Sequence, residues 1–368
     1  MSKQGNSPKL PHGSGIIRVL AIDLGGTNAS FAIVETAGAK QAILSRLVLS
    51  SGQQKSFAAA LRTALRHFDN EPELMASVKA CCVSAAGPVA AGVCTPTNLP
   101  YTVSTHEVEN ILKVPCSIMN DFEAICYGVP LLDLNDAQQV CRIHLTQERQ
   151  DNSDGEYGVA AVIGAGTGLG MGYLSWVPPD LKVFASEGGH LDFAPWDEQS
   201  SELASYLQHE LGRFPDREHA LSGPSIPRIY RFMTSSGRAP TNELSLRIGK
   251  LAHNEQPEAI AAASVGDAAD PGCKATMSMF FALYGRQCGA AALQFLPSYG
   301  VFLAGGIASK NAPALMSSPE FVEAYLAGYS GNLRRELLAT PLYIILDYQI
   351  SLLGAAHAAR QRLTDPAA

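Results

Sequence analysis

Residues 20–34 read LAIDLGGTNASFAIV: an apolar, β-branched run, an aspartate, two adjacent glycines and a second apolar run. This pattern predicts a strand, a glycine turn and a second strand. Residues 158–174, GVAAVIGAGTGLGMGYL, show the same arrangement later in the chain. We interpret the two occurrences as related halves of one α/β protein that face a common cleft.

The length and charge of the chain limit what it can be. A chain of 368 residues is longer than a single hydrophobic core usually supports, which predicts two domains or one domain with a large insertion. The formal net charge is −7 and no basic block is present, so we expect no nucleic-acid partner.

Several features predict a cytoplasmic protein. Residues 1–15 are polar and rich in Pro and Gly, which predicts a mobile tail rather than a secretory or transit signal. The most apolar stretches, 80–94 and 277–296, are interrupted by Gly87-Pro88 and by Arg286, so no membrane crossing is expected. The eight cysteines form no C-x-x-C pair and are expected to be reduced, buried thiols.

Hydrophobic periodicity and turn residues predict the remaining elements. Strands are expected at 17–22, 31–34, 77–84, 114–119, 158–163, 171–174, 300–304 and 342–346, and helices at 57–68, 200–211, 275–295, 312–316 and 351–363, with further helices between 227 and 263.

The two glycine turns are candidate phosphate sites, because backbone N–H groups can approach phosphate oxygens where no Cβ intervenes. Neither turn is a P-loop, and Leu169 stands where a dinucleotide fingerprint requires its third glycine. Each turn alone is equally typical of a tight hairpin. Asp23 either caps its turn or holds Mg²⁺, directly or through water, and its combination with two glycine turns favours nucleotide binding.

Asp121 follows Asn120 where a strand is expected to give way to a helix. It is either an ordinary N-cap or a carboxylate held ionised by the helix N-terminus to accept a proton from an attacking hydroxyl. Phosphoryl transfer requires little base strength, so a well-placed carboxylate is sufficient.

The segment SEGGH, 186–190, places the Glu187 carboxylate and the His190 imidazole three residues apart. A metal site would need distant partners, whereas recognition of vicinal hydroxyls needs only donors and acceptors of this kind. Glu218 by itself is typical of a solvated helix residue.

Eight segments in order resemble the bacterial glucokinase family, and SEGGH followed by DFAP is the most specific. They are LAIDLGGTNASFAIV (20–34), AGPV (86–89), NLPY (98–101), NDFEAICYGV (120–129), GAGTGLG (164–170), SEGGHLDFAP (186–195), EHALSGP (218–224) and FLAGGIASK (302–310).

The resemblance implies a fold and an activity. The fold is the two-domain actin/hexokinase-like (ribonuclease H-like) α/β ATPase with an interdomain cleft, with a small domain of residues 16–131 plus 349–368 and a large domain of residues 132–348. The activity is ATP-dependent phosphorylation of the 6-hydroxyl of D-glucose, the entry step of glycolysis, with Mg²⁺ as cofactor. A homodimer is expected from the resemblance alone.

The resemblance also implies roles for individual residues. Asp121 is the expected catalytic base. The expected sugar ligands are Asn120, Glu187, His190 and Glu218. The expected nucleotide-binding residues are Asp23, which also holds Mg²⁺ through water, with Gly25, Gly26, Thr27 and Asn28 in the first turn, Gly166, Thr167 and Gly168 in the second, and Gly305 and Gly306 in an adenosine motif.

The chain departs from the family pattern at Ser30, where an arginine is common, and at Tyr101, where a tryptophan is frequent. Three alternatives to a glucokinase stay open at this level: a kinase for another hexose, a sugar sensor without turnover, and a polymerising or chaperone-like ATPase. Hexose epimers differ by one hydroxyl, and the residue pattern does not separate them. The intact Asp121 argues against the sensor, and SEGGH argues against the last class.

Overall fold

The computed structural model describes residues 15–37, 40–145, 157–177 and 180–364. The chain divides into two compact units. Unit 1 holds residues up to 135, residues 173–185 and residues from 347 onward, and unit 2 holds residues 136–172 and 186–346. The tail expected at 1–15 lies outside the described residues, except for Gly15.

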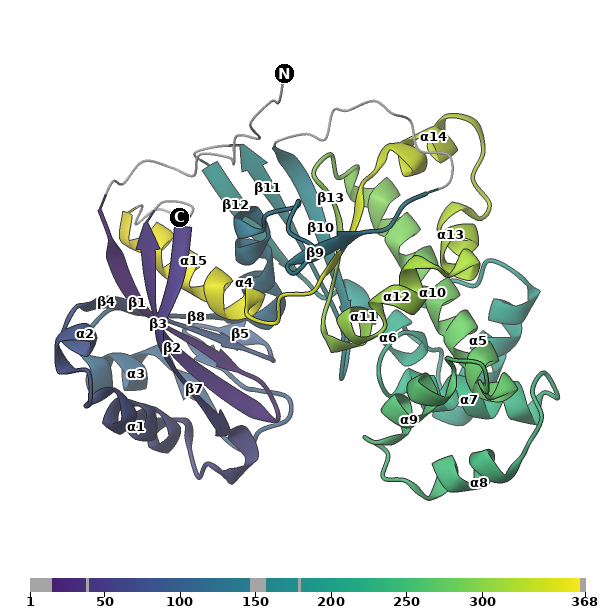
Figure 1. Ribbon diagram of the computed structural model, residues 1–368, viewed down its shortest axis with the longest axis horizontal. Coiled ribbons are helices and arrows are strands. Elements are labelled where there is room, and N and C mark those ends of the chain that lie inside the picture. The colour runs from purple at the N-terminus through teal and green to yellow at the C-terminus, as the bar shows by residue number, and fades with distance from the viewer. Residues whose placement is uncertain (1–14, 38–39, 146–156, 178–179, 365–368) are drawn as a thin grey trace. The chain divides into compact units, whose positions relative to one another are not determined.

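Unit 1 is built on a sheet of strand order β3-β2-β1-β4-β8 (Figure 1). The strands are β1 (Ile17–Leu24), β2 (Asn28–Ala37), β3 (Lys40–Ser50), β4 (Val78–Ala85) and β8 (Cys116–Asn120). The strands β1, β4 and β8 run parallel, whereas β2 pairs antiparallel with both β1 and β3.

The parallel strands bring the expected functional residues of unit 1 to one edge. Asp23 is in register with Ser84, and Ala85 is in register with Asn120. The first glycine turn and the start of α4 (Asp121–Gly128) therefore follow the carboxyl ends of β1 and β8, the two parallel strands on either side of β4. This is the edge at which open α/β sheets bind their ligands.

Helices cover both faces of this sheet. Side chains alternate along β1, so Leu20 and Ile22 share one face and Asp23 lies on the other. The first face packs in one core with Phe57 and Leu61 of α1 (Phe57–Phe68). The helix α15 (Ile350–Thr364) packs against β1, β4 and α4, as its yellow ribbon in Figure 1 shows.

Shorter elements complete unit 1. They are η1 (Ser51–Gln53), α2 (Pro72–Ala76), α3 (Thr105–Leu112), η2 (Val129–Leu131) and the small sheet of β5 (Val89–Ala90), β6 (Val93–Cys94) and β7 (Val103–Ser104).

A second large sheet has the order β12-β11-β10-β13-β14-β9. Its strands are β9 (Val140–Arg142), β10 (Gly158–Ala165), β11 (Leu169–Val177), β12 (Asp180–Ser186), β13 (Gly300–Ala304) and β14 (Leu342–Ile345). In unit 2, β10, β13 and β14 run parallel, and Gly164 is in register with Ala304. The second glycine turn and Gly305 therefore also lie together at a carboxyl edge.

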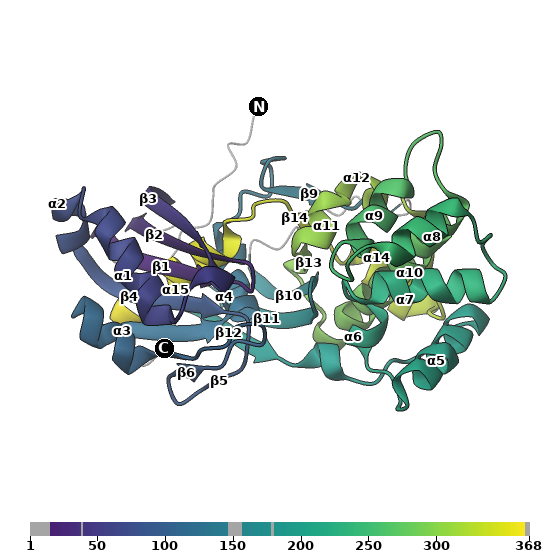
Figure 2. The ribbon, with the colours of Figure 1, turned by 90° about the horizontal axis from the view of Figure 1, so that it is seen from below.

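The long helix α10 (Pro271–Phe295) forms the centre of the helical part of unit 2. In Figure 2, α7 (Ser225–Ser235) and α9 (Gln256–Ala263) lie against α10 and against each other, and α8 (Glu243–Lys250) lies against α9. The other helices are η3 (Gly188–His190), α5 (Glu198–Leu211), α6 (Arg217–Ala220), α11 (Gly306–Lys310), α12 (Ala312–Met316), α13 (Pro319–Leu326) and α14 (Gly331–Ala339).

Within the described ranges, no helix is long and apolar enough to span a membrane. The eight cysteines are free thiols, and six of them are buried as predicted. The prediction of burial is wrong for Cys116 and Cys141, which are partly exposed.

Gly354 allows α15 to approach α4 closely. A methyl group at this position would overlap the carbonyl oxygen of Ala124 and lie 2.8 Å from the backbone nitrogen of Gly128. Because both neighbours are backbone atoms, the strain cannot be relieved by a rotamer change. We expect Gly354→Ala to lower the free energy of unfolding by about 1–3 kcal/mol.

Calorimetric unfolding measures this loss. Gly249→Ala is the matched control, because Gly249 is exposed in α8 and a methyl group there meets no atom within 4 Å. It should be neutral or stabilising by up to about 1 kcal/mol. Equal melting temperatures for both variants would contradict the close approach of the two helices.

Candidate active site

The first glycine turn joins β1 to β2 and leaves Gly26, Thr27 and Asn28 exposed. The Gly25 nitrogen donates to the carbonyl oxygen of Asn28 at 2.9 Å, and the Ser51 hydroxyl donates to the carbonyl oxygen of Gly25 at 2.7 Å. These bonds hold a short turn whose exposed backbone can meet an anion at the carboxyl edge of the sheet.

Asp23 lies at the end of β1 as a hydrogen-bonded, largely desolvated carboxylate. Its Oδ1 accepts from the Ser351 hydroxyl at 3.0 Å and from the Ser84 hydroxyl at 3.2 Å. Burial raises the pKa of the Asp23 carboxyl above its ordinary value, and the two hydroxyls and the positive charge of Arg46 oppose this rise.

The two departures from the family pattern both connect to the first turn. The guanidinium of Arg46, on β3, donates to the Ser30 hydroxyl at 3.1 Å, so a positive charge is present beside Ser30. The Tyr101 hydroxyl donates to the carbonyl oxygen of Ser51 at 3.3 Å. Arg46 thus supplies a positive charge that acts on Asp23 from β3, the second strand along the sheet from β1.

Asn120 and Asp121 mark the junction of β8 and α4. The N-cap is Asn120, whose Oδ1 accepts from the Phe122 nitrogen at 2.9 Å and whose Nδ2 donates to the carbonyl oxygen of Gly87 at 3.3 Å. Asp121 is the first helical residue, and its Oδ1 also accepts from the Phe122 nitrogen, at 3.0 Å. The ordinary capping role that was open for Asp121 therefore belongs to Asn120, and the Asp121 carboxylate is half-buried in the field of the helix N-terminus.

The second glycine turn joins β10 to β11 and holds Glu218. The Gly166 nitrogen donates to the carbonyl oxygen of Gly168 at 2.8 Å, and the Leu169 nitrogen donates to Glu218 Oε2 at 2.8 Å. A Cβ at Gly168 would overlap that same carboxylate oxygen. Glycine is therefore required here because the Glu218 carboxylate lies directly against the turn.

Glu187 and His190 lie at either end of the short turn η3. Their side chains are exposed, and His190 Nε2 is 4.0 Å from Glu187 Oε2. A Cβ at Gly188 would lie 2.8 Å from the Met171 sulfur, and one at Gly189 would overlap the carbonyl oxygen of Leu169. The two glycines thus allow the turn to lie against β11 while both polar side chains project into solvent.

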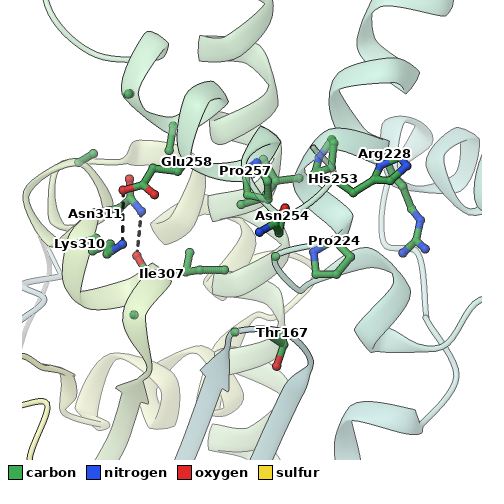
Figure 3. Close-up of a pocket in the computed structure, with 18 of the residues that line it drawn as sticks. Thr167, Pro224, Arg228, His253, Asn254, Pro257, Glu258, Ile307, Lys310 and Asn311 are labelled. Atoms are coloured by element: carbon green, nitrogen blue, oxygen red, sulfur yellow. Dashed lines mark hydrogen bonds and ion pairs between the residues drawn. The ribbon is translucent and has the colours of Figure 1, made fainter. Parts of the chain in front are cut away.

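A pocket of about 1190 Å³ opens beside the second turn in unit 2. Figure 3 shows its walls, which come from the second turn, α7, α9 and α11. Ala261, Ala262 and Ile307 make much of the lining apolar, and the Lys310 ammonium pairs with the Glu258 carboxylate at 3.4 Å at the rim (Figure 3). An apolar slot that ends at a glycine turn has the chemistry to hold a planar ring with an attached phosphate chain.

Gly305 and Gly306 connect β13 to this pocket. Gly305 has a φ of 89°, which disfavours any residue with a Cβ, and a Cβ there would lie 3.2 Å from the carbonyl oxygen of Ala165. Gly306 opens α11 and lines the pocket together with Gly166 and Thr167. The structure therefore places parts of the second and third expected motifs on one pocket.

A family model described as Glucokinase matches residues 20–362. The chain belongs to the glucokinase family. A glucokinase of Nostoc punctiforme is 32% identical over 355 residues, covering 92% of this chain and 97% of that protein. A crystal structure of glucokinase from an Antarctic psychrotroph is 26% identical with a TM-score of 0.72, covering 94% of this chain and 99% of that one.

A second solved structure, glucokinase from Balamuthia mandrillaris in complex with glucose, is 20% identical with a TM-score of 0.71 and covers 94% of both chains. These similarities confirm the predicted family and the predicted actin/hexokinase-like α/β fold class.

Each unit of this glucokinase-family chain gathers its own set of expected residues. Unit 1 places the first turn at the same sheet edge as Asn120 and Asp121, and unit 2 places the Glu218 carboxylate on the second turn and Glu187 near His190. Sequence reasoning missed the residues that hold these groups: Ser84, Ser351, Arg46, Asp216 and His219.

The raised pKa of Asp23 predicts a gain of stability on removing its charge. When folding raises the pKa of a carboxyl, the protonated group favours the folded state. This contribution to stability is complete at pH values below the ordinary pKa, and it is lost as the pH rises through the pKa of the folded state. We expect Asp23→Asn to melt a few degrees above wild type at about pH 7.5, with the difference shrinking towards about pH 4.

Thermal unfolding across this pH range checks the expectation, with Asp69→Asn at the exposed end of α1 as a surface-carboxylate control. A variant that melts below wild type at every pH would show that the ionised carboxylate stabilises the fold instead.

Proposed function

We propose that this chain transfers the γ-phosphoryl group of ATP to the 6-hydroxyl of D-glucose, giving glucose 6-phosphate and ADP. The proposal rests on one observation: the second glycine turn both lines the large pocket and binds the Glu218 carboxylate. Gly166 and Thr167 line the large pocket, while Leu169 at the other end of the turn binds the Glu218 carboxylate. A nucleotide's phosphates and a polyol held by Glu218 would thus meet at one turn of the chain.

The pocket in unit 2 suits an adenosine group. Its apolar lining from α9 and α11 would receive the base, and Gly305 and Gly306 would allow the ribose close to the backbone. The amides of Thr167 and Gly168 would face the phosphate chain, while the Gly166 amide holds the turn closed through its bond to the Gly168 carbonyl oxygen. In unit 1, Gly26, Thr27 and Asn28 present a second exposed turn for phosphate oxygens, and Gly25 closes that turn.

Asp23 fits a magnesium ion that is bound mainly through water. A desolvated carboxylate whose pKa is raised gains from a nearby cation, and Mg²⁺ usually keeps several waters beside one or two carboxylates. Among the described residues, no group of three His, Cys, Asp or Glu side chains forms a complete metal cage. In this proposal the ion accompanies the nucleotide and reduces the negative charge of its phosphates.

The sugar ligands in this proposal are Asn120, Glu187, His190 and Glu218. Carboxylates accept hydrogen bonds from hydroxyls, and the imidazole can accept or donate. The 4.0 Å separation of His190 Nε2 and Glu187 Oε2 suits two hydroxyls on adjacent carbons. The Asn120 amide retains one N–H beyond the one that it gives to Gly87.

Asp121 acts as the base in this proposal. Its carboxylate accepts the proton of the 6-hydroxyl as the oxygen attacks the γ-phosphorus and the bond to ADP breaks. Its place in the first turn of α4 favours the ionised form, because the helix dipole and the Phe122 amide both stabilise negative charge.

We further propose that units 1 and 2 correspond to the predicted small and large domains, with residues 173–185 added to the small one. A cytoplasmic location stays a prediction from the sequence features described above, and a homodimer stays a prediction from the resemblance. Another hexose is the second candidate substrate, and a panel of glucose, mannose, fructose, galactose and amino sugars in a coupled ADP-release assay separates the two.

Asp121→Asn tests the assignment of the base. The amide cannot accept the proton, so kcat should fall by about 10²–10⁴-fold while glucose affinity, measured by calorimetry, stays within a few fold. Glu107→Gln, an exposed change in α3 of the same unit, should keep full activity. Wild-type turnover in Asp121→Asn would refute the assignment.

Ala262→Trp tests the nucleotide pocket. Ala262 is exposed in α9 and lines the pocket, so an indole there would fill the space that the adenine ring of ATP occupies in this proposal. We expect the KM for ATP to rise about tenfold or more, with the KM for glucose unchanged. Leu246→Trp, on the exposed surface of α8, is the control. An unchanged KM for ATP would place the base elsewhere.

A further inference from the structure

Asp216 lies at the N-cap of α6, two residues before Glu218 on the same helix. Its Oδ1 accepts from the backbone nitrogen of His219 at 3.0 Å and from the His219 ring, while its Oδ2 lies 3.3 Å from His190 Nδ1. One carboxylate thus joins two separate parts of the proposed sugar site.

The backbone brings these two parts together. The Arg217 nitrogen donates to the carbonyl oxygen of Leu191 at 2.9 Å, and the Phe193 nitrogen donates to the carbonyl oxygen of Pro215 at 3.1 Å. The segment after His190 therefore pairs with the segment that enters α6, with Asp192 opposite Asp216. Asp216 is held beside His190 by main-chain bonds that do not depend on either side chain.

Arg213 determines the tautomer of His219. Its guanidinium, which can only donate, lies 3.1 Å from His219 Nε2, so that nitrogen must accept. His219 Nδ1 then carries the hydrogen and donates to Asp216 Oδ1; its longer contact, 3.4 Å from the Asp216 nitrogen, is not used in this tautomer. Oδ1 is fully occupied, and Oδ2 is left for His190.

The same reasoning determines the tautomer of His190. Burial favours the protonated form of Asp216, but hydrogen bonds from His219 and His190 outweigh it and lower the pKa of this carboxyl. An ionised carboxylate only accepts, so His190 Nδ1 carries the hydrogen and Nε2 of the neutral ring presents a lone pair. That lone pair and the Glu187 carboxylate, 4.0 Å away, form a pair of acceptors for sugar hydroxyls.

We propose that Asp216 is a positioning residue for sugar binding: it orients His190 and selects the tautomer whose Nε2 accepts a hydrogen bond from the substrate. The inference rests on the proposed function, in which His190 is a sugar ligand. The inference adds Asp216 to the proposed sugar site as a residue that does not touch the substrate. Arg213 and His219 support it, because their contacts keep Asp216 Oδ2 directed to His190.

Asp216→Ser separates positioning from helix capping. Serine caps a helix about as well as aspartate but cannot reach His190 with a second acceptor. We expect the melting temperature to change little, the KM for glucose to rise about tenfold, and the KM for ATP to stay unchanged. Asp197→Ser is the matched control, because Asp197 caps α5 in the same unit and its side chain accepts from the backbone nitrogen three residues on, as that of Asp216 does in α6.

A double-mutant cycle with His190→Ala shows whether the effect acts through His190. We expect Asp216→Ser to add nothing to the KM increase caused by His190→Ala. An unchanged KM in Asp216→Ser, or fully additive effects in the double variant, would overturn the inference while His190 remained a sugar ligand. An unchanged KM in His190→Ala alone would overturn the sugar-ligand assignment itself and the inference with it.

Discussion

A carboxylate removed from water must be satisfied by nearby donors, and this constraint organises unit 1. Asp23 sits at the carboxyl end of β1, and its donors come from Ser84 on β4 and Ser351 on α15, whose hydroxyls also lie 2.8 Å from each other. The three side chains join a central strand, its parallel neighbour and the last helix of the chain. The first glycine turn begins directly after this junction, so its position follows from how the carboxylate is held.

The two glycine turns differ in the groups that they offer. The first turn follows the charged side chain of Asp23, whereas the second offers backbone groups. The second glycine turn contains no ionisable residue, yet it contacts the pocket through Gly166 and Thr167 and binds Glu218 through Leu169. The tight packing of Gly168 on Glu218 and of Gly223 on the Gly166 carbonyl leaves little freedom for the turn. Rigid amides of this kind can stabilise developing charge without reorganising during the reaction.

Local patterns in the sequence predicted much of this fold. The predicted helix at 57–68 and the predicted strand at 300–304 have the same bounds as α1 and β13, because an apolar stripe or a short apolar run needs no distant partner to be recognised. The strand β3 was missed, since each of its residues is at least partly exposed and its alternation mixes polar and apolar types. The strand β12 was missed for a similar reason.

The residues of the candidate site also divide into those that a local pattern predicts and those that it does not. Glycine turns and the SEGGH segment are local and were identified, whereas their supporting residues are distant: Ser351 lies 328 residues from Asp23, and Asp216 lies 26 residues from His190. Arg46 lies next to Ser30 only because β2 and β3 pair antiparallel. Such partners are determined by strand pairing and helix docking, which no short motif encodes.

The position of α15 also bears on the order of synthesis. Unit 1 needs Gly354 and Ser351 to cover β1 and to complete the bonding of Asp23, and these residues leave the ribosome after all of unit 2. One face of the unit 1 sheet therefore stays uncovered by α15 while some two hundred intervening residues are synthesised and can fold. During that interval the nascent chain exposes an apolar sheet face, which is the state in which chaperones engage a growing polypeptide.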